Sequence, residues 1–60
     1  MQESLMMTAQ EVAAALSVSE SKAYKYIREL NNELKEQGKL TVRGKVNRRY
    51  FNMKTLQEGA

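Results

Sequence analysis

The chain has 60 residues, which is enough for one small domain with a limited hydrophobic core. It contains no Cys and no His, which excludes disulfides and Cys- or His-based zinc sites as sources of stability. Ten Lys and Arg residues against seven Asp and Glu residues give a formal net charge of +3. With no linker-like or repeated segment, we expect a single domain over residues 1–60, with residues 1–7 as a lead-in and residues 57–60 frayed.

The positive charge is concentrated in one part of the chain. Residues 39–54 carry six basic side chains and no acidic one, whereas the first 20 residues carry three Glu and no Lys or Arg. An asymmetry of this kind is typical of proteins that bind a polyanion. No apolar run approaches the ~20 residues needed to span a membrane, and the first residues lack the basic and apolar regions of a signal peptide.

The first helix is predicted over residues 9–16. The segment from Thr8 to Glu11 has the pattern of a capping box, in which each side chain bonds the backbone amide of the other residue. Met7 and Val12 have the positions of the accompanying hydrophobic staple. Two independent signals therefore start a helix at the residue after Thr8.

A tight turn and a long second helix follow. Ser17 stands in the turn at a position where Gly is the more usual residue. Ser19 is a good N-cap for the second helix, and Gly38 can supply the left-handed residue that ends it. An apolar stripe at helical spacing is expected to face the core, and it consists of Ala23, Ile27, Leu30 and Leu34.

The opposite face of the second helix combines short hydrogen-bonding groups with cations, at Ser21, Lys25, Arg28 and Asn32. Such groups can read base edges and contact phosphates. A polar outer face is also ordinary for any amphipathic helix, so this helix alone leaves both interpretations open. The basic residues lie mainly in its first half, which is the end that enters the DNA groove in many DNA-binding proteins.

After Gly38 the hydrophobic pattern changes from helical to alternating, which predicts a β-hairpin with strands near residues 40–43 and 46–51 and a turn at Gly44. The side chains expected to face the core are those of Leu40, Val42, Val46 and Tyr50, with the register open by one residue. A short helical turn capped by Asn52 is predicted next, with Met53 and Leu56 packed inward.

Four cations lie on this predicted hairpin: Arg43, Lys45, Arg48 and Arg49. Proteins also place charged residues on exposed strand edges to prevent edge-to-edge pairing. Edge protection does not require a single sign of charge, so the clustering favours contact with the phosphates of a nucleic acid.

Three segments resemble known families. TAQEVAAALSVS at residues 8–19 resembles the opening of the MerR-like and excisionase families, and SKAYKYIR at residues 21–28 continues into their recognition helix. GKLTVRGKVNRRYF at residues 38–51 is similar to the tail of small regulators and excisionase-like proteins on mobile elements of Gram-positive bacteria. The expected fold is α+β and mainly α, a winged helix-turn-helix with a two-stranded β-hairpin wing and a short C-terminal helical turn.

The resemblance implies binding of double-stranded DNA, with the recognition helix in the major groove and the wing tip in the minor groove. The recognition-helix candidates are Ser19, Ser21, Lys22, Lys25 and Arg28, with Asn32 added from the polar face. The wing candidates are Arg43, Lys45, Arg48 and Arg49. The long dimerisation helix and effector domain of MerR regulators do not follow in this sequence, so we expect no cofactor, no metal and no small-molecule effector.

We therefore expect a sequence-specific DNA-binding protein in the cytoplasm, associated with the nucleoid, acting as a small transcriptional regulator or an excisionase-like recombination factor. Its expected partners are double-stranded DNA, neighbouring copies of itself or an integrase. An enzyme is not expected, because there is no His, Cys, Gly-rich phosphate loop or carboxylate pair in an apolar setting. The alternatives are a protein-interaction module built on Tyr24, Tyr26 and the Leu30/Leu34 stripe, and the DNA-binding head of a longer replication or partition protein. RNA binding is possible on charge alone, but aromatic stacking platforms are scarce.

Overall fold

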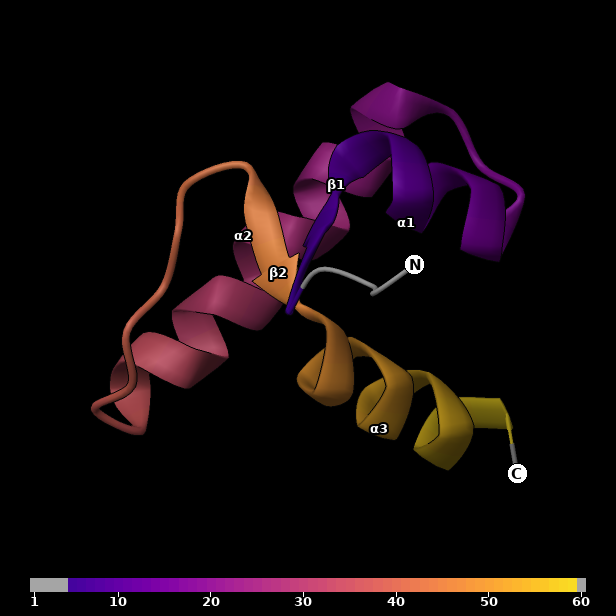
Figure 1. Ribbon diagram of the computed structural model, residues 1–60. Coiled ribbons are helices and arrows are strands. Elements are labelled where there is room, and N and C mark those ends of the chain that lie inside the picture. The colour runs from indigo at the N-terminus through magenta and orange to yellow at the C-terminus, as the bar shows by residue number, and fades with distance from the viewer. Residues whose placement is uncertain (1–4, 60) are drawn as a thin grey trace.

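The computed structural model describes residues 5–59, with side chains up to residue 56. The elements in chain order are β1 (Met6–Thr8), α1 (Ala9–Leu16), α2 (Glu20–Glu36), β2 (Lys45–Asn47) and α3 (Arg48–Gly59). Figure 1 shows the two strands crossing α2 near the centre of the molecule, with α1 leaving the upper end of the sheet and α3 the lower end. The predicted fold class, a mainly helical α+β fold of the winged-helix type, is confirmed.

The predicted capping box starts α1. The Glu11 amide donates to Thr8 Oγ1 at 3.2 Å, and the Thr8 amide donates to Glu11 Oε1 at 3.0 Å. The helix ends at Ser17, whose backbone is left-handed with φ 57° and ψ 46°. That region is sterically unfavourable for a residue with a Cβ, which explains why Gly is the more usual residue at such a turn. The Ala13 carbonyl accepts hydrogen bonds from the Ser17 amide and, at 3.0 Å, from the Val18 amide, which closes the helix end.

Both predicted ends of α2 are confirmed. Ser19 Oγ accepts a hydrogen bond from a first-turn amide at 3.2 Å. At the other end, Gly38 has φ +79° and its amide donates to the Lys35 carbonyl at 2.9 Å. The Lys39 amide donates to the Leu34 carbonyl at 3.0 Å. These two bonds form a Schellman motif, so the helix ends through local chemistry that the sequence predicts.

The strand pairing differs from the prediction. The lead-in supplies β1, which pairs antiparallel with β2 and places Met7 opposite Val46. The predicted strand over residues 40–43 is wrong, because only Val42 takes part in pairing, through an isolated bridge to Lys45. Leu40 is 99% exposed and Val42 is 47% exposed, so neither is a core residue as expected. Pairing with β1 buries Met7 and Val46 together, which a two-stranded hairpin of residues 40–51 would not achieve.

We refer to residues 39–47 as the wing and to residues 42–45 as the wing turn. The Lys45 amide donates to the Val42 carbonyl at 3.1 Å, and Gly44 has φ +79°. A four-residue turn with a positive φ at its third residue favours Gly there. The wing is therefore a hairpin of minimal length with an irregular first arm, which Figure 1 shows running back along α2.

The second predicted strand, residues 46–51, is wrong beyond residue 47, because α3 begins at Arg48. The Tyr50 amide donates to Asn47 Oδ1 at 3.0 Å, so Asn47 has the role of an N-cap. The predicted cap at Asn52 is therefore wrong, since Asn52 lies inside α3. Helical spacing then turns Phe51, which is 4% exposed, into the core.

Two inward positions predicted near the C-terminus are also wrong. Met53 is 47% exposed and Leu56 is 74% exposed. Both lie on α3, whose buried apolar residue, among those with described side chains, is Phe51. Residues 57–60, predicted to be frayed, lie outside the residues whose side chains are described, although the helix itself extends to Gly59.

One hydrophobic core joins all five elements. The predicted α2 stripe is confirmed, with Ala23, Ile27 and Leu34 buried and Leu30 packed against the core cluster. The buried cluster consists of Met7, Ala9, Val12, Ala13, Ala23, Ile27, Val46 and Phe51. A free energy of unfolding of a few kcal/mol is expected for a chain of this size, so a single core substitution should remove a large part of it.

Polar contacts connect α3 to both of the other helices. The Arg48 guanidinium donates to Glu11 Oε2 at 2.9 Å, which joins α3 to α1. The Tyr50 hydroxyl donates to Glu33 Oε1 at 2.6 Å, and Lys54 Nζ lies 3.3 Å from the same oxygen, which joins α3 to α2. The Arg48 side chain thus stabilises the packing of the helices, although in the sequence it is one of the clustered basic residues.

The observed core predicts that two apolar side chains of the wing contribute very differently to the free energy of unfolding. Val46→Ala should lower the free energy of unfolding by about 1–3 kcal/mol, because it removes buried methyl groups and leaves a cavity. Leu40→Ala should change it by less than about 0.5 kcal/mol, because that side chain is exposed to solvent. Chemical denaturation of the two variants measures this difference, and a larger loss for Leu40→Ala would contradict the described core.

The loss of folding stability at acidic pH should depend on Glu11 and Glu33. The Thr8 amide and then the Arg48 guanidinium hold the pKa of Glu11 below its ordinary value of 4.5. The Tyr50 hydroxyl holds the pKa of Glu33 below the same value. Because both folded pKa values lie below the unfolded ones, this stabilisation is complete above pH 4.5 and is lost as the pH falls through the folded values.

Glu11→Gln keeps an acceptor for the Thr8 amide but removes the ion pair with Arg48. The variant should therefore be less stable than wild type at neutral pH and should lose less stability on acidification. Thermal unfolding followed at a series of pH values checks this expectation. Parallel curves for the two proteins at all pH values would contradict it.

Candidate nucleic-acid interface

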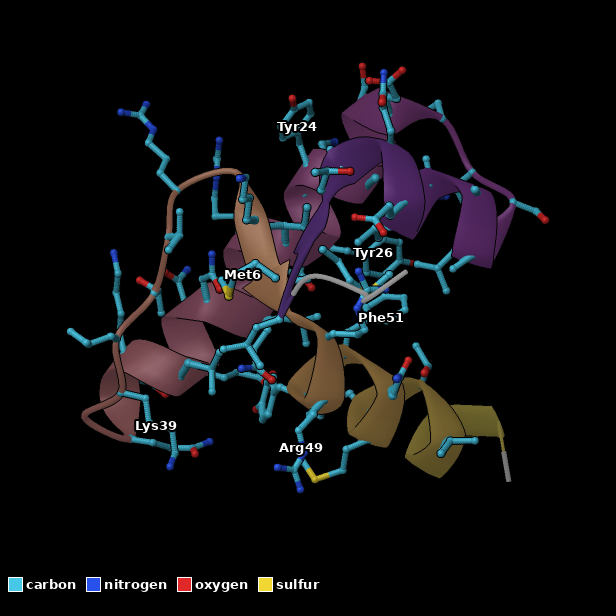
Figure 2. The ribbon with its side chains drawn as sticks, in the orientation of Figure 1. Met6, Tyr24, Tyr26, Lys39, Arg49 and Phe51 are labelled. Atoms are coloured by element: carbon cyan, nitrogen blue, oxygen red, sulfur yellow. The ribbon has the colours of Figure 1, made fainter. Side chains whose placement is uncertain are left out.

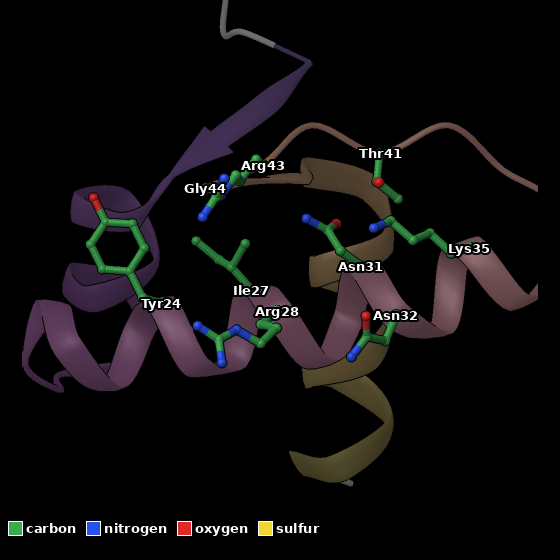
Figure 3. A pocket seen from close by; sticks show the side chains of 9 residues that line it. All are labelled: Tyr24, Ile27, Arg28, Asn31, Asn32, Lys35, Thr41, Arg43 and Gly44. Atoms are coloured by element: carbon green, nitrogen blue, oxygen red, sulfur yellow. The ribbon is translucent and has the colours of Figure 1, made fainter.

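A groove lies between the exposed face of α2 and the wing. It has a volume of about 820 Å³. Its lining residues are Tyr24, Ile27, Arg28, Asn31, Asn32 and Lys35 from α2, and Thr41, Arg43 and Gly44 from the wing. Figure 3 shows these two sets facing each other, with Ile27 and Asn31 between them. We call this feature the α2–wing groove.

The α2 side of the groove follows directly from helical geometry. Ile27 is 1% exposed and turns toward the core, so residues at the next positions around the helix turn outward. Arg28, Asn32 and Lys35 are exposed and lie along successive turns of the same face. Tyr24 is also exposed, and its ring closes one end of the groove beside Gly44.

The wing side of the groove is the wing turn. Arg43 is exposed at the tip, next to Gly44. The positive φ of Gly44 places the tip of the turn over α2, and Figure 3 shows Arg43 and Arg28 on opposite sides of the groove. Two guanidinium groups from separate elements therefore border one recess.

The floor of the groove contains a buried amide that the sequence analysis missed. Asn31 is 7% exposed. Its Nδ2 donates to the Val42 carbonyl at 3.1 Å and to the Lys45 carbonyl at 2.8 Å. Its Oδ1 has no hydrogen-bond partner within the part of the chain that the structure describes. A signal was present in the sequence, because Asn31 stands four residues after Ile27 and three before Leu34, within the apolar stripe.

The electrostatic character of the groove is cationic. Arg28, Lys35 and Arg43 are among its lining residues, and none of the lining residues is acidic. None of these three cations takes part in a salt bridge within residues 5–59. Unpaired cations around a recess that also holds amide and hydroxyl groups provide the contacts that phosphate oxygens accept.

Of the predicted site residues, Arg28, Asn32 and Arg43 line the groove. The remaining recognition-helix candidates are exposed on the first half of α2 or just before it, outside the groove lining: Ser19, Ser21, Lys22 and Lys25. Ser19 Oγ already accepts the capping hydrogen bond. Lys45 is exposed on β2 at the base of the wing turn. The sequence analysis missed Lys35, Thr41 and Tyr24 as groove residues.

The placement of Arg48 and Arg49 on the second strand of a wing is wrong, because both lie in the first turn of α3. The Arg48 guanidinium is paired with Glu11. Arg49 lines a second hollow of about 600 Å³ on the other side of the wing, together with Leu34, Lys39, Leu40, Asn47, Tyr50 and Met53. The two hollows share no residue, and Figure 2 shows Arg49 at the opposite end of the molecule from Tyr24.

No helix within the described residues is long and apolar enough to cross a membrane. The acidic residues of α2 do not reach the α2–wing groove, and Glu33 instead bonds Tyr50 and Lys54 on the α3 side. The two faces of α2 thus differ in charge, and the face beside the wing is the basic one.

Comparison with known proteins identifies a relative that shows the family of this chain. Over 45 residues, which are 75% of this chain and 70% of the relative, the chain is 40% identical to the ICEBs1 excisionase of Bacillus subtilis (strain 168). No family model matches the chain, and no solved structure gives a significant match. The expected resemblance to excisionases is confirmed, and its MerR-like part stays a prediction. By this identity and coverage, the chain belongs to the excisionase family that the ICEBs1 protein represents.

Proposed function

We propose that this protein is a non-enzymatic, sequence-specific DNA-binding protein that acts in the cytoplasm as an accessory factor in the recombination of a mobile element. The observation that carries the proposal is the α2–wing groove, where cations from two separate elements border one recess without a lining carboxylate. The relative named as an excisionase supports the recombination role. The other candidate role, transcriptional regulation, would use the same DNA-binding surface.

In the proposed complex, the exposed face of α2 enters the major groove of a duplex, which is wide enough to admit a helix. The wing turn then reaches the adjacent minor groove with Arg43. The sugar-phosphate backbone that separates the two DNA grooves would lie in the α2–wing groove, between Lys35 on one side and Arg43 on the other. Neutralised phosphates release counterions, which supplies most of the affinity.

The proposal assigns base reading to exposed polar residues of α2, two of which, Arg28 and Asn32, also line the groove. Ser21, Lys25 and Arg28 are exposed and recur along one helical face, and Asn32 continues that face. Side chains of these types can pair with base edges in the major groove. Lys22, Lys45 and Lys35 are assigned to phosphates, because a compact ammonium group has little directional selectivity.

One module of this size contacts few base pairs, so useful specificity requires help. The proposed partners are neighbouring copies of the protein on the same DNA and the recombinase, an integrase, that the accessory factor assists. The proposal requires no cofactor, metal or small-molecule effector. Arg48 and Arg49 are left out of the proposed contact surface, since one is paired with Glu11 and the other lines the second hollow.

Two arginines distinguish the DNA surface of the structure from the one expected from the sequence. Arg43→Ala should weaken binding to all duplexes and lower the slope of log affinity against log salt concentration by about 1, because one phosphate contact is lost. Arg49→Ala removes the same charge from the other side of the wing and should leave both quantities nearly unchanged. Fluorescence anisotropy with a labelled duplex at several salt concentrations measures this, and equal losses for the two variants would contradict the proposed surface.

Substitution of Arg28 tests whether this side chain recognises the DNA base sequence. Arg28→Ala should reduce the affinity for the preferred site by about 1–3 kcal/mol and reduce the affinity for unrelated duplexes by less, if its guanidinium contacts a guanine edge. Selection of preferred duplexes from a random pool, repeated with the variant, provides the measurement. A uniform loss on all sequences would assign Arg28 to a phosphate instead.

A further inference from the structure

Asn31 is a buried polar side chain at a position where an apolar one would continue the core. Its neighbours on the inner face of α2, Ile27 and Leu34, are buried, and Leu30 packs against the core. Its Oδ1 lacks a hydrogen-bond partner within residues 5–59, which is unfavourable for a buried acceptor. A helix selected for stability alone would carry a residue such as Leu at this position. Core packing therefore does not explain why Asn occupies this position.

The hydrogen bonds of Asn31 give that reason. Its Nδ2 donates to the carbonyls of Val42 and Lys45, which are the first and last residues of the wing turn. These are the hydrogen bonds that join the wing turn to α2 within the described residues. One NH₂ group thus holds both ends of the turn.

Apart from the pairing of Lys45 with Thr8 in the β1–β2 sheet, few other contacts fix the wing turn in place. Leu40 is almost fully exposed, Val42 is about half exposed, and Arg43 at the tip is exposed as well. The bridge between Val42 and Lys45 closes the turn on itself but does not connect it to α2. Val46, which is fully buried, anchors only the base of the wing. Without the Asn31 amide, the turn would remain attached at its base but would lose its fixed distance from α2.

We propose that Asn31 is a positioning residue for DNA binding, which holds the wing turn at a fixed distance from α2 so that Arg28 and Arg43 engage one duplex together. This inference rests on the proposed DNA-binding function. Asn31 is three residues after Arg28 on α2, and both line the α2–wing groove with Arg43. A wing turn that is already ordered avoids the entropy loss of ordering it on the DNA.

The proposal predicts coupling between Asn31 and Arg43 in a double-mutant cycle. Asn31→Leu, close in size, removes the amide and leaves the core stripe apolar. It should lower DNA affinity by roughly the same factor as Arg43→Ala, while in the Arg43→Ala background it should have an effect within about twofold. Asn52→Leu, the same change at an exposed position of α3, is the matched control and should leave the affinity unchanged. Thermal unfolding of each variant verifies folding, and the melting temperature of Asn31→Leu should not fall.

A second measurement is independent of DNA. The Lys45 amide, which donates to the Val42 carbonyl within the wing turn, should exchange its hydrogen faster in Asn31→Leu than in wild type. The amides of α2 should be unaffected. This readout is specific to the wing, because general destabilisation would accelerate exchange in both elements together.

The outcomes separate the two proposals. Suppose that wild type binds duplex DNA and that Arg43→Ala weakens this binding. If Asn31→Leu then leaves the affinity unchanged, or lowers it by the same factor in wild type and in the Arg43→Ala background, the positioning role is overturned and DNA binding stands. Unchanged Lys45 exchange in Asn31→Leu also overturns the positioning role. If wild type does not bind duplex DNA, the proposed function fails and the inference fails with it.

Discussion

The antiparallel pairing of β1 with β2 is the interaction on which the rest of this small fold depends. It joins the segment before α1 to the segment before α3, and it buries Met7 and Val46 side by side over α2. A chain of this length can bury only a small core, so the pairing matters because it adds two buried apolar side chains from segments that are distant in the sequence. The same pairing fixes the base of the wing. The position of the base of the wing relative to α2 follows from this contact, while the Asn31 amide joins the wing turn to α2 across the groove.

The distribution of basic residues between folding and binding is the second feature of the molecule. All six basic residues between positions 39 and 54 belong to one cluster in the sequence. In the structure they separate: Arg43 borders the α2–wing groove, Lys45 is exposed on β2, Arg48 pairs with Glu11, Lys54 lies beside Glu33, and Arg49 and Lys39 line the second hollow. A cluster of charge in the sequence therefore does not correspond to a single surface, because α3 redirects successive residues around a helix.

The elements that could be predicted from the sequence are those determined by local chemistry. The capping box at Thr8 and the cap at Ser19 set the start of each of the first two helices, and the left-handed Gly38 ends the second. The pairing of β1 with β2 could not be predicted in this way, because its two partners are far apart in the sequence and each strand has only three residues. The start of α3 was predicted incorrectly because Tyr50 and Phe51 favour strands by propensity, and the cap at Asn47 with burial of Phe51 overrides that preference.

For the site, helical periodicity was sufficient to place Arg28 and Asn32 on the exposed face of α2, whereas Lys35 and Thr41 become groove residues only through the path of the wing. The central claim is that the α2–wing groove and the adjoining face of α2 form one DNA-binding surface. Titration of the isotopically labelled protein with a short duplex, followed by amide chemical shifts, tests it most directly. We predict shifts concentrated at α2 positions such as Arg28 and at the wing turn, with little change on α3. Shifts confined to α3 and the second hollow, with the wing turn unaffected, would contradict it.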